Sequence, residues 1–181
     1  MIIEYEEKIG SDFEGTIIDI ETIGEFNRFY RYDSRQYEKM TQVIFGYINQ
    51  EHLYIYCAKD IRGINQLKEM TQKIIDNLDR PFYAFNCEFE SGVWFHHVGI
   101  KILFDGELNR DKYEKKKAIV RLLKIPNYDD PFFDNGFCCM EAWDNEEFNK
   151  AIAHNRSCLL KERDILLKRG YREPGELEFV K

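Results

Sequence analysis

Hydrophobic residues occur along the chain in short groups separated by polar segments. A β-branched run at 17–20 stops at Gly24, which is typical of a buried strand. Apolar runs at 42–48 and 53–58 flank a polar tetrapeptide and predict a hairpin. Three strands therefore open the expected fold, with a polar and aromatic loop at 25–39 after the first.

After the hairpin the pattern changes to helical spacing. Apolar residues three and four apart predict a helix over 61–79, Pro81 ends it, and 82–85 has the composition of a short strand. We expect the remaining elements to be a helix at about 88–97, a strand at 100–104, and helices at about 111–123, 144–152 and 155–169. No repeat or linker divides the chain. The pattern therefore predicts that residues 1–181 form a single α/β domain with a mixed five-stranded sheet flanked by helices.

The composition is that of a globular chain. Hydrophobic residues make up 44% of it, and no long uncharged apolar stretch predicts a membrane span. The acidic N-terminus is unlike a signal peptide, so we expect a cytoplasmic protein. The five cysteines are odd in number and form no CxxC pair, which favours reduced thiols over a disulfide framework or a zinc site.

Charge is distributed unevenly along the chain. The net charge of −7 by itself speaks against a polyanionic partner. Residues 1–38 carry ten acids against four bases, whereas 108–125 carry seven bases against two acids and 154–172 six against two. This asymmetry suits an acidic pocket beside basic surfaces that guide a polyanion. An ordinary solvated helix face at 112–117 explains the lysines there equally simply.

Two acids are set into the first strand. Side chains alternate across a strand, so Asp19 and Glu21 project from the same face. Adjacent carboxylates repel each other and lose hydration on burial, and a divalent cation between them removes that cost. Mg²⁺ or Mn²⁺ prefers such oxygen ligands. The alternative is a strand that leaves the core with both acids solvated.

A second acidic motif, Asn86 to Glu90, lies at a strand-to-helix junction, where α/β sheets place ligands and where Asn86 is a good helix cap. Together with the first motif, hydrophobic-Asp-x-Glu-Thr-x-Gly, it resembles the DEDD (DnaQ-like) 3′-5′ exonucleases of the ribonuclease H-like superfamily. The resemblance implies that Asp19, Glu21 and Glu90 bind metal. It further implies that Thr22, Asn86 and Phe89 contact the substrate.

The third motif of that family is a helix with Tyr or His followed four or five residues later by Asp. His154 matches, and His154-Asn155 resembles the closing element of a bacterial and phage branch of predicted exonucleases, but the expected acid falls on Cys158 or Leu159. At 100° per residue, Glu162 lies on the inward stripe of this helix. Asp164 lies on the outer face, where a pair with Lys168 explains it.

Glu162 is therefore the expected fourth metal ligand, with Asp164 as the competing assignment. A turn cluster is the simplest interpretation of Asp129, Asp130 and Asp134, and the alternative is that Asp130 and Asp134 are reserve ligands. The aromatic residues near the first motif are candidates for stacking on unpaired bases, with aromatic loop packing as the simpler alternative; they are Phe26, Phe29, Tyr30 and Tyr32.

The resemblance implies a 3′-5′ exonuclease that hydrolyses phosphodiester bonds at a single-stranded DNA or RNA end. Two Mg²⁺ or Mn²⁺ ions would clamp the scissile phosphate, and His154, with a pKa near neutrality, would orient or deprotonate the attacking water. One alternative is a degenerate domain that binds nucleic acid or a protein partner without cleaving. Another is a structural or adaptor domain with no nucleic-acid role.

Overall fold

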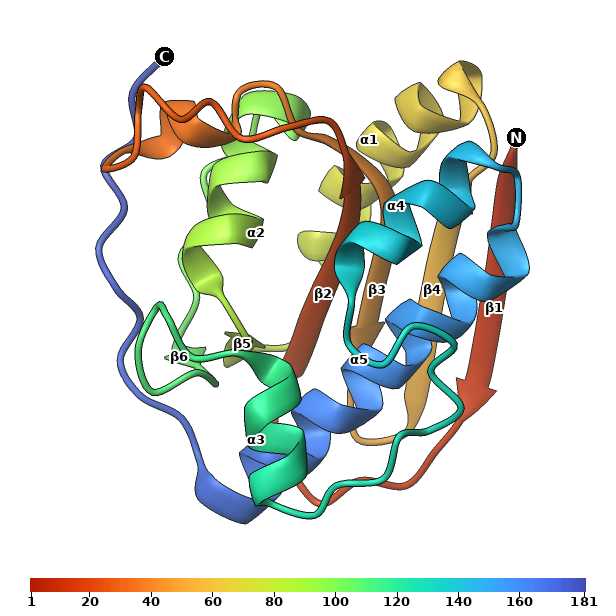
Figure 1. The fold of residues 1–181 in the computed structure, drawn as a ribbon, viewed down its shortest axis with the longest axis vertical. Helices are drawn as coiled ribbons and strands as arrows, with labels where there is room; N and C mark the ends of the chain where they lie inside the picture. Colours follow the sequence, from red (N-terminus) through yellow and green to blue (C-terminus); the bar gives the residue numbers. More distant parts are fainter.

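An open, mixed six-stranded sheet forms the centre of the molecule (Figure 1), and the computed structural model describes all residues from 1 to 181. The strands are β1 (Ile2–Lys8), β2 (Thr16–Ile23), β3 (Thr41–Ile48), β4 (His52–Ala58), β5 (Phe82–Ala84) and β6 (Gly106–Glu107). Their order across the sheet is β1-β4-β3-β2-β5-β6. Strands β1 to β4 pair antiparallel, whereas β5 pairs parallel with both β2 and β6.

The α/β class, the buried first strand and the hairpin are confirmed, but the expected number of strands is wrong. The additional strand is β1, in which Glu4 and Glu6 are exposed while Tyr5 between them packs on the core. Its alternation marks a half-buried edge strand, which the acidic composition obscured. The prediction of a strand at 100–104 is also wrong, because this segment is a loop and β6 begins at Gly106.

Helices cover both faces of the sheet. They are α1 (Ile61–Ile75), α2 (Cys87–Val93), α3 (Lys116–Leu122), α4 (Gly136–Asp144) and α5 (Phe148–Arg169), with a 3₁₀ turn η1 (Ser34–Tyr37) and a π-helical turn η2 (Trp94–Val98). Figure 1 shows α4 and α5 in front of the sheet and α1 behind it. None of these helices combines the length and apolar character needed to cross a membrane.

Two helix predictions need correction. The helices expected at 144–152 and 155–169 are replaced by α4 and one continuous α5, because inward-facing polar residues of α5 interrupt the apolar periodicity. Helix α3 starts later than the expected position 111. There the Asp111 carboxylate accepts a hydrogen bond from the backbone N–H of Tyr113 (2.8 Å) instead, a local contact that competes with helix formation.

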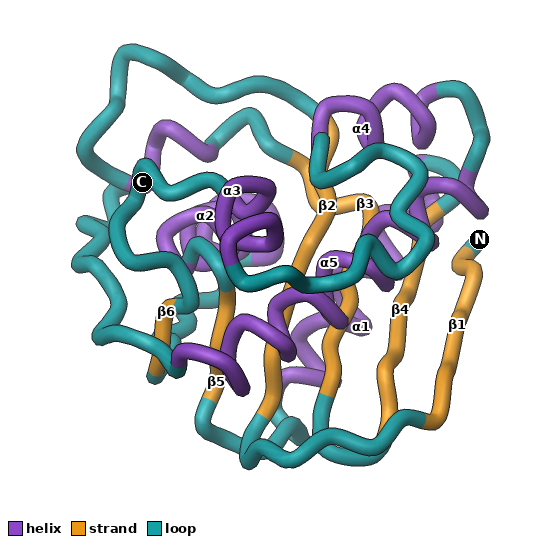
Figure 2. Tube along the Cα trace, turned by 60° about the horizontal axis from the view of Figure 1, so that its bottom comes forward, coloured by secondary structure: helices purple, strands orange, loops and turns teal.

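Helix α5 lies diagonally across β2, β3 and β4 (Figure 2), and Gly46 of β3 permits this close approach. Gly46 pairs with Asp19 of β2 in the antiparallel ladder. A Cβ atom at position 46 would lie 2.0 Å from Oδ1 of Asn155 and 2.9 Å from Leu159. The missing side chain therefore makes room for the polar stretch of α5 directly over the first acidic motif.

We predict that Gly46→Ala lowers the free energy of unfolding by about 1–3 kcal/mol, because the added methyl group forces α5 away from the sheet. Urea unfolding monitored by tryptophan fluorescence measures this change. Gly10→Ala is the matched control, since a Cβ atom there meets nothing within 4 Å. Equal stability of the two variants would contradict the role given to Gly46.

Candidate functional site

A pocket of about 180 Å³ lies where β2, α2, α3 and α5 meet. The sequence-predicted residues that line it are Asp19, Glu21, Asn86, Phe89, Glu90 and His154. Lys116, Asp134 and Cys158 line it as well. The structure thus brings together residues from motifs far apart in the sequence. Thr22, expected to contact substrate, follows a register shift in β2 and does not line the pocket.

Asp19 is held from two sides. Its Oδ2 accepts a hydrogen bond from Nδ2 of Asn155 (2.7 Å), and its Oδ1 lies 3.4 Å from Nζ of Lys116. Glu21 lies on the same face of β2, as the strand period predicts. Burial and the negative charge of Asp19 raise the pKa of Glu21 to about 7, although the positive charge of His154 acts in the opposite direction.

Glu90 reaches the pocket from α2 and is only 3% exposed. Its Oε2 atom has no hydrogen-bond partner. Burial, followed by the negative charges of Asp19 and Glu162, raises its pKa well above the usual range. An unpartnered buried carboxylate oxygen is costly. Glu90 lines the pocket together with Asp19 and Glu21, and carboxylate oxygens are the ligand type of the hard cation expected from the sequence.

Asn86 and Glu88 show which residues of the second motif face the pocket. Asn86 occupies the N-cap position of α2, but its side chain makes no capping hydrogen bond, so its predicted role as a cap is wrong. The carboxylate of Glu107 instead accepts from the backbone N–H of Cys87 (3.1 Å). The Asn86 amide therefore remains available to the pocket. Glu88 does not line the pocket, in agreement with the register that selected Glu90.

His154 lies buried between two carboxylates. Its Nδ1 is 2.8 Å from Oδ1 of Asp130, and its Nε2 is 3.7 Å from Oε1 of Glu21. Burial acts to lower the pKa of His154, but Glu21, the hydrogen bond to Asp130 and, when it is ionised, the Cys158 sulfur outweigh burial and raise the pKa to about 12. The expectation of a pKa near neutrality is therefore wrong for the metal-free protein. His154 is an imidazolium and a hydrogen-bond donor.

Asp130 and Asp134 are fixed by a lysine that the sequence analysis missed. Lys161 is fully buried in α5, and its Nζ lies 2.9 Å from Oδ2 of Asp130 and 2.7 Å from Oδ1 of Asp134. These ion pairs use both acids that were considered reserve ligands, although Asp134 also lines the pocket. Lys161 is seven residues after His154, and this spacing places both on one helix face.

Glu162 faces inward as predicted and is fully buried. Its partner in the structure is Lys116, whose Nζ lies 2.5 Å from Oε1 of Glu162. Asp164 is bound by Arg163 and by the hydroxyl group of Tyr128, so the predicted pair with Lys168 is wrong.

Cys158 stands where the third motif would have an acid. Its sulfur and carboxylate oxygens of Asp19 and Glu21 all lie within 4.8 Å of one another. Burial raises the pKa of its thiol, which keeps Cys158 neutral. A second donor group with the same spread consists of Glu21, Cys139 and His154. Soft sulfur atoms therefore border the carboxylates of this pocket.

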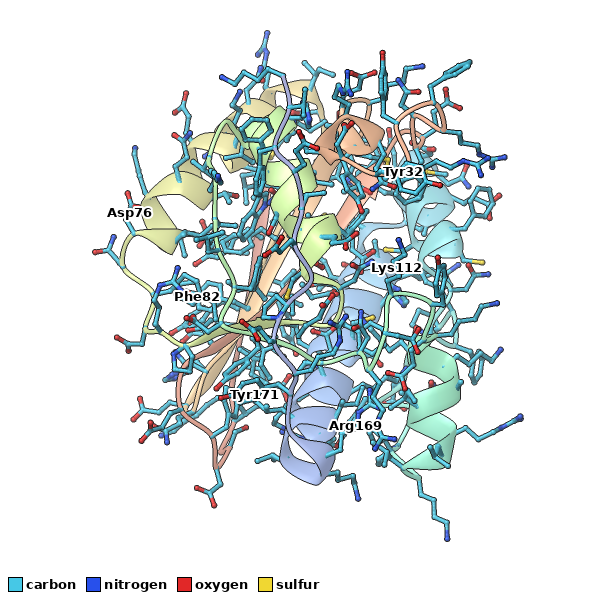
Figure 3. All side chains as sticks on the ribbon, turned by 90° about the vertical axis from the view of Figure 1, so that its left-hand side faces the viewer. Tyr32, Asp76, Phe82, Lys112, Arg169 and Tyr171 are labelled. Carbon is cyan, nitrogen blue, oxygen red and sulfur yellow. The ribbon has the colours of Figure 1, made fainter.

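The basic segments are less available to a polyanion than their charge count suggests. In 154–172, Arg156 pairs with Glu7, Arg169 with Glu114 and Arg172 with Glu107. The bases that remain exposed are Lys168 in 154–172 and six residues in and around α3, at Arg110, Lys112, Lys115, Lys117, Arg121 and Lys124. Lys112 is labelled in Figure 3. The predicted basic surface thus lies mostly at the α3 segment.

The pKa of His154 predicts how stability depends on pH in EDTA. The folded-state pKa of about 12 lies above the unfolded value, so the stability that the imidazolium provides is complete below pH 6.5 and is lost as the pH rises. Between pH 7.5 and 9 the loss from His154 alone is about 1.4 kcal/mol per pH unit. We expect His154→Gln to remove this slope in urea unfolding, and His52→Gln to keep it. The same slope in both variants would show that His154 is neutral when folded.

Comparisons with protein-family models, with curated proteins and with solved structures give no match for this chain.

Proposed function

We propose that this protein is a metal-dependent phosphodiester hydrolase, a 3′-5′ exonuclease of the ribonuclease H-like type that acts on single-stranded DNA or RNA ends. The observation that carries the proposal is the unpartnered Glu90 carboxylate beside Asp19 and Glu21 at one pocket. The sheet supports the fold assignment, because β2, β3 and β4 form the three-strand antiparallel opening of the resemblance, and β5 and β6 continue the sheet in parallel beside β2. Strand β1 adds a fourth antiparallel strand at the edge.

Asp19, Glu21 and Glu90 would hold Mg²⁺ or Mn²⁺, which supplies charge stabilisation and a more acidic water at the phosphate. Asn155 fixes the Asp19 carboxylate through its 2.7 Å hydrogen bond, so this ligand keeps its orientation. His154, held by Asp130, serves as a cationic hydrogen-bond donor toward a phosphate oxygen. In this role it orients the substrate and does not take a proton.

Features at the rim of the pocket support a single-stranded substrate. Phe89 lines the pocket and packs against Phe26 and Tyr37, with ring centroids 6.2 and 5.9 Å apart. Phe26 is half-exposed and offers a surface on which a base can stack. The exposed lysines of α3 supply the positive charge that guides a phosphate backbone.

Removing either metal-binding carboxylate should abolish cleavage. We predict that Asp19→Asn and Glu90→Gln each reduce the Mn²⁺-dependent cleavage rate of end-labelled single strands by roughly 10³-fold. Glu88→Gln is the matched control and should retain activity. A denaturing gel with Mn²⁺ and with EDTA measures the rate. Equal effects of Glu88→Gln and Glu90→Gln would refute the assignment, and activity in EDTA would refute the metal mechanism.

Glu162 and Asp164, the two candidate acids of the third motif, should also differ in how much their substitution lowers the cleavage rate. We predict that Glu162→Gln lowers the cleavage rate at least tenfold, because Lys116 then loses its nearer partner and moves toward Asp19, where it competes with the metal. Asp164→Asn should cleave at close to the rate of the unchanged protein, because the partners of Asp164 lie outside the pocket. If Asp164→Asn is the inactive variant, the assignment of Glu162 is wrong.

A second candidate function is a catalytically degenerate nucleic-acid-binding domain. The specific observation that favours it is Lys116, a cation of the chain itself that already neutralises part of the acid cluster. Tight binding of labelled single strands, together with no cleavage and no Mn²⁺ binding, would decide for this candidate.

A further inference from the structure

Lys116 is placed unlike its neighbours in α3. The side chain of Lys116 is 17% exposed, whereas Lys115 and Lys117 on either side are exposed. Its Nζ lies 3.4 Å from Oδ1 of Asp19 and 2.5 Å from Oε1 of Glu162, and 5.4 Å above the ring of Phe85. The ammonium group is therefore held between two acids from different elements, at the wall of the pocket.

Asp19 and Glu162 stabilise the Lys116 ammonium group at this position. Glu162 is fully buried, and neither of its carboxylate oxygens has a partner with hydrogen-bond geometry, so Lys116 is its only counter-charge at ion-pair distance. Burial acts to lower the pKa of Lys116, but Asp19, Cys158 and Glu162 raise it well above the usual range. Lys116 therefore carries its positive charge at neutral pH.

Lys116 already neutralises the negative charge between Asp19 and Glu162. Glu21 and Glu90 line the same pocket, and neither carboxylate pairs with a lysine or an arginine. Glu21 lies 3.7 Å from Nε2 of His154, and Oε2 of Glu90 is buried and unpartnered. These remaining acids leave an open position for one divalent ion, although a two-ion site requires cations at two positions.

We propose that Lys116 supplies the second positive charge of this site, so that the pocket binds one divalent ion through Asp19, Glu21 and Glu90, while the ammonium occupies the position between Asp19 and Glu162. The inference rests on the proposed function, because it assumes that the open position binds metal. An ammonium donates hydrogen bonds and stabilises negative charge on a phosphate oxygen. Lys116 is then a substrate-positioning residue.

Counting the bound ions tests the inference without any measurement of cleavage. The full chain is titrated with Mn²⁺, and free ion is measured by electron paramagnetic resonance and heat by calorimetry. We expect one bound ion for the unchanged protein. Lys116→Met should bind two, with the first at least tenfold tighter, because a positive charge within a few ångströms has been removed. Lys117→Met, at an exposed neighbour, should bind one ion with unchanged affinity.

Two ions bound to the unchanged protein overturn the inference, and this count requires no variant to fold. One ion in both the unchanged protein and folded Lys116→Met also overturns it, because the lysine then occupies no ion position. If the unchanged protein binds none and Lys116→Met binds one, Lys116 blocks the only site and the inference is wrong. No binding to any of the proteins refutes the proposed function itself. Lys116→Arg retains the charge and should bind one ion.

Discussion

The contact of Asp19 and Glu162 with a single ammonium is the interaction on which the centre of this molecule depends. Asp19 belongs to β2, Glu162 to α5 and Lys116 to α3, so three elements meet at one charge cluster. Removing one member of a buried cluster leaves an uncompensated charge, which costs several kcal/mol. The position of α3 is thus tied to the sheet through the contact of Lys116 with Asp19.

A second buried cluster fixes the opposite side of the pocket. Lys161 holds Asp130 and Asp134, and Asp130 in turn holds His154. These contacts secure the irregular segment before α4 to the middle of α5. Because both nitrogen atoms of the His154 ring face carboxylates, the ring is held in one orientation and in its charged form. The pocket is therefore preorganised on both sides before any ligand arrives.

Local periodicity was sufficient to predict which way Asp19, Glu21 and Glu162 face, but not their partners. Asp19 and Glu21 follow from the two-residue period of a strand, and the inward position of Glu162 follows from the 100° rotation per helix residue. Lys116 and Lys161 could not be found this way, because their partners lie on other elements far along the chain. The count of bases along 108–125 and 154–172 included Lys116 and Lys161 as solvated charges. In the structure both side chains are largely removed from solvent, so that assumption is wrong for them.

The missing third-motif acid and the buried lysine are connected through charge. Cys158 lies within reach of Asp19 and Glu21 at the place where an acid was expected, and burial keeps its thiol neutral. A carboxylate there would add a negative charge to a cluster in which Glu21 and Glu90 already have raised pKa values. A neutral Cys158 reduces the negative charge available to cations, and Lys116 uses part of what remains. Both features act in the same direction, because each leaves less negative charge at the pocket than four free carboxylates would.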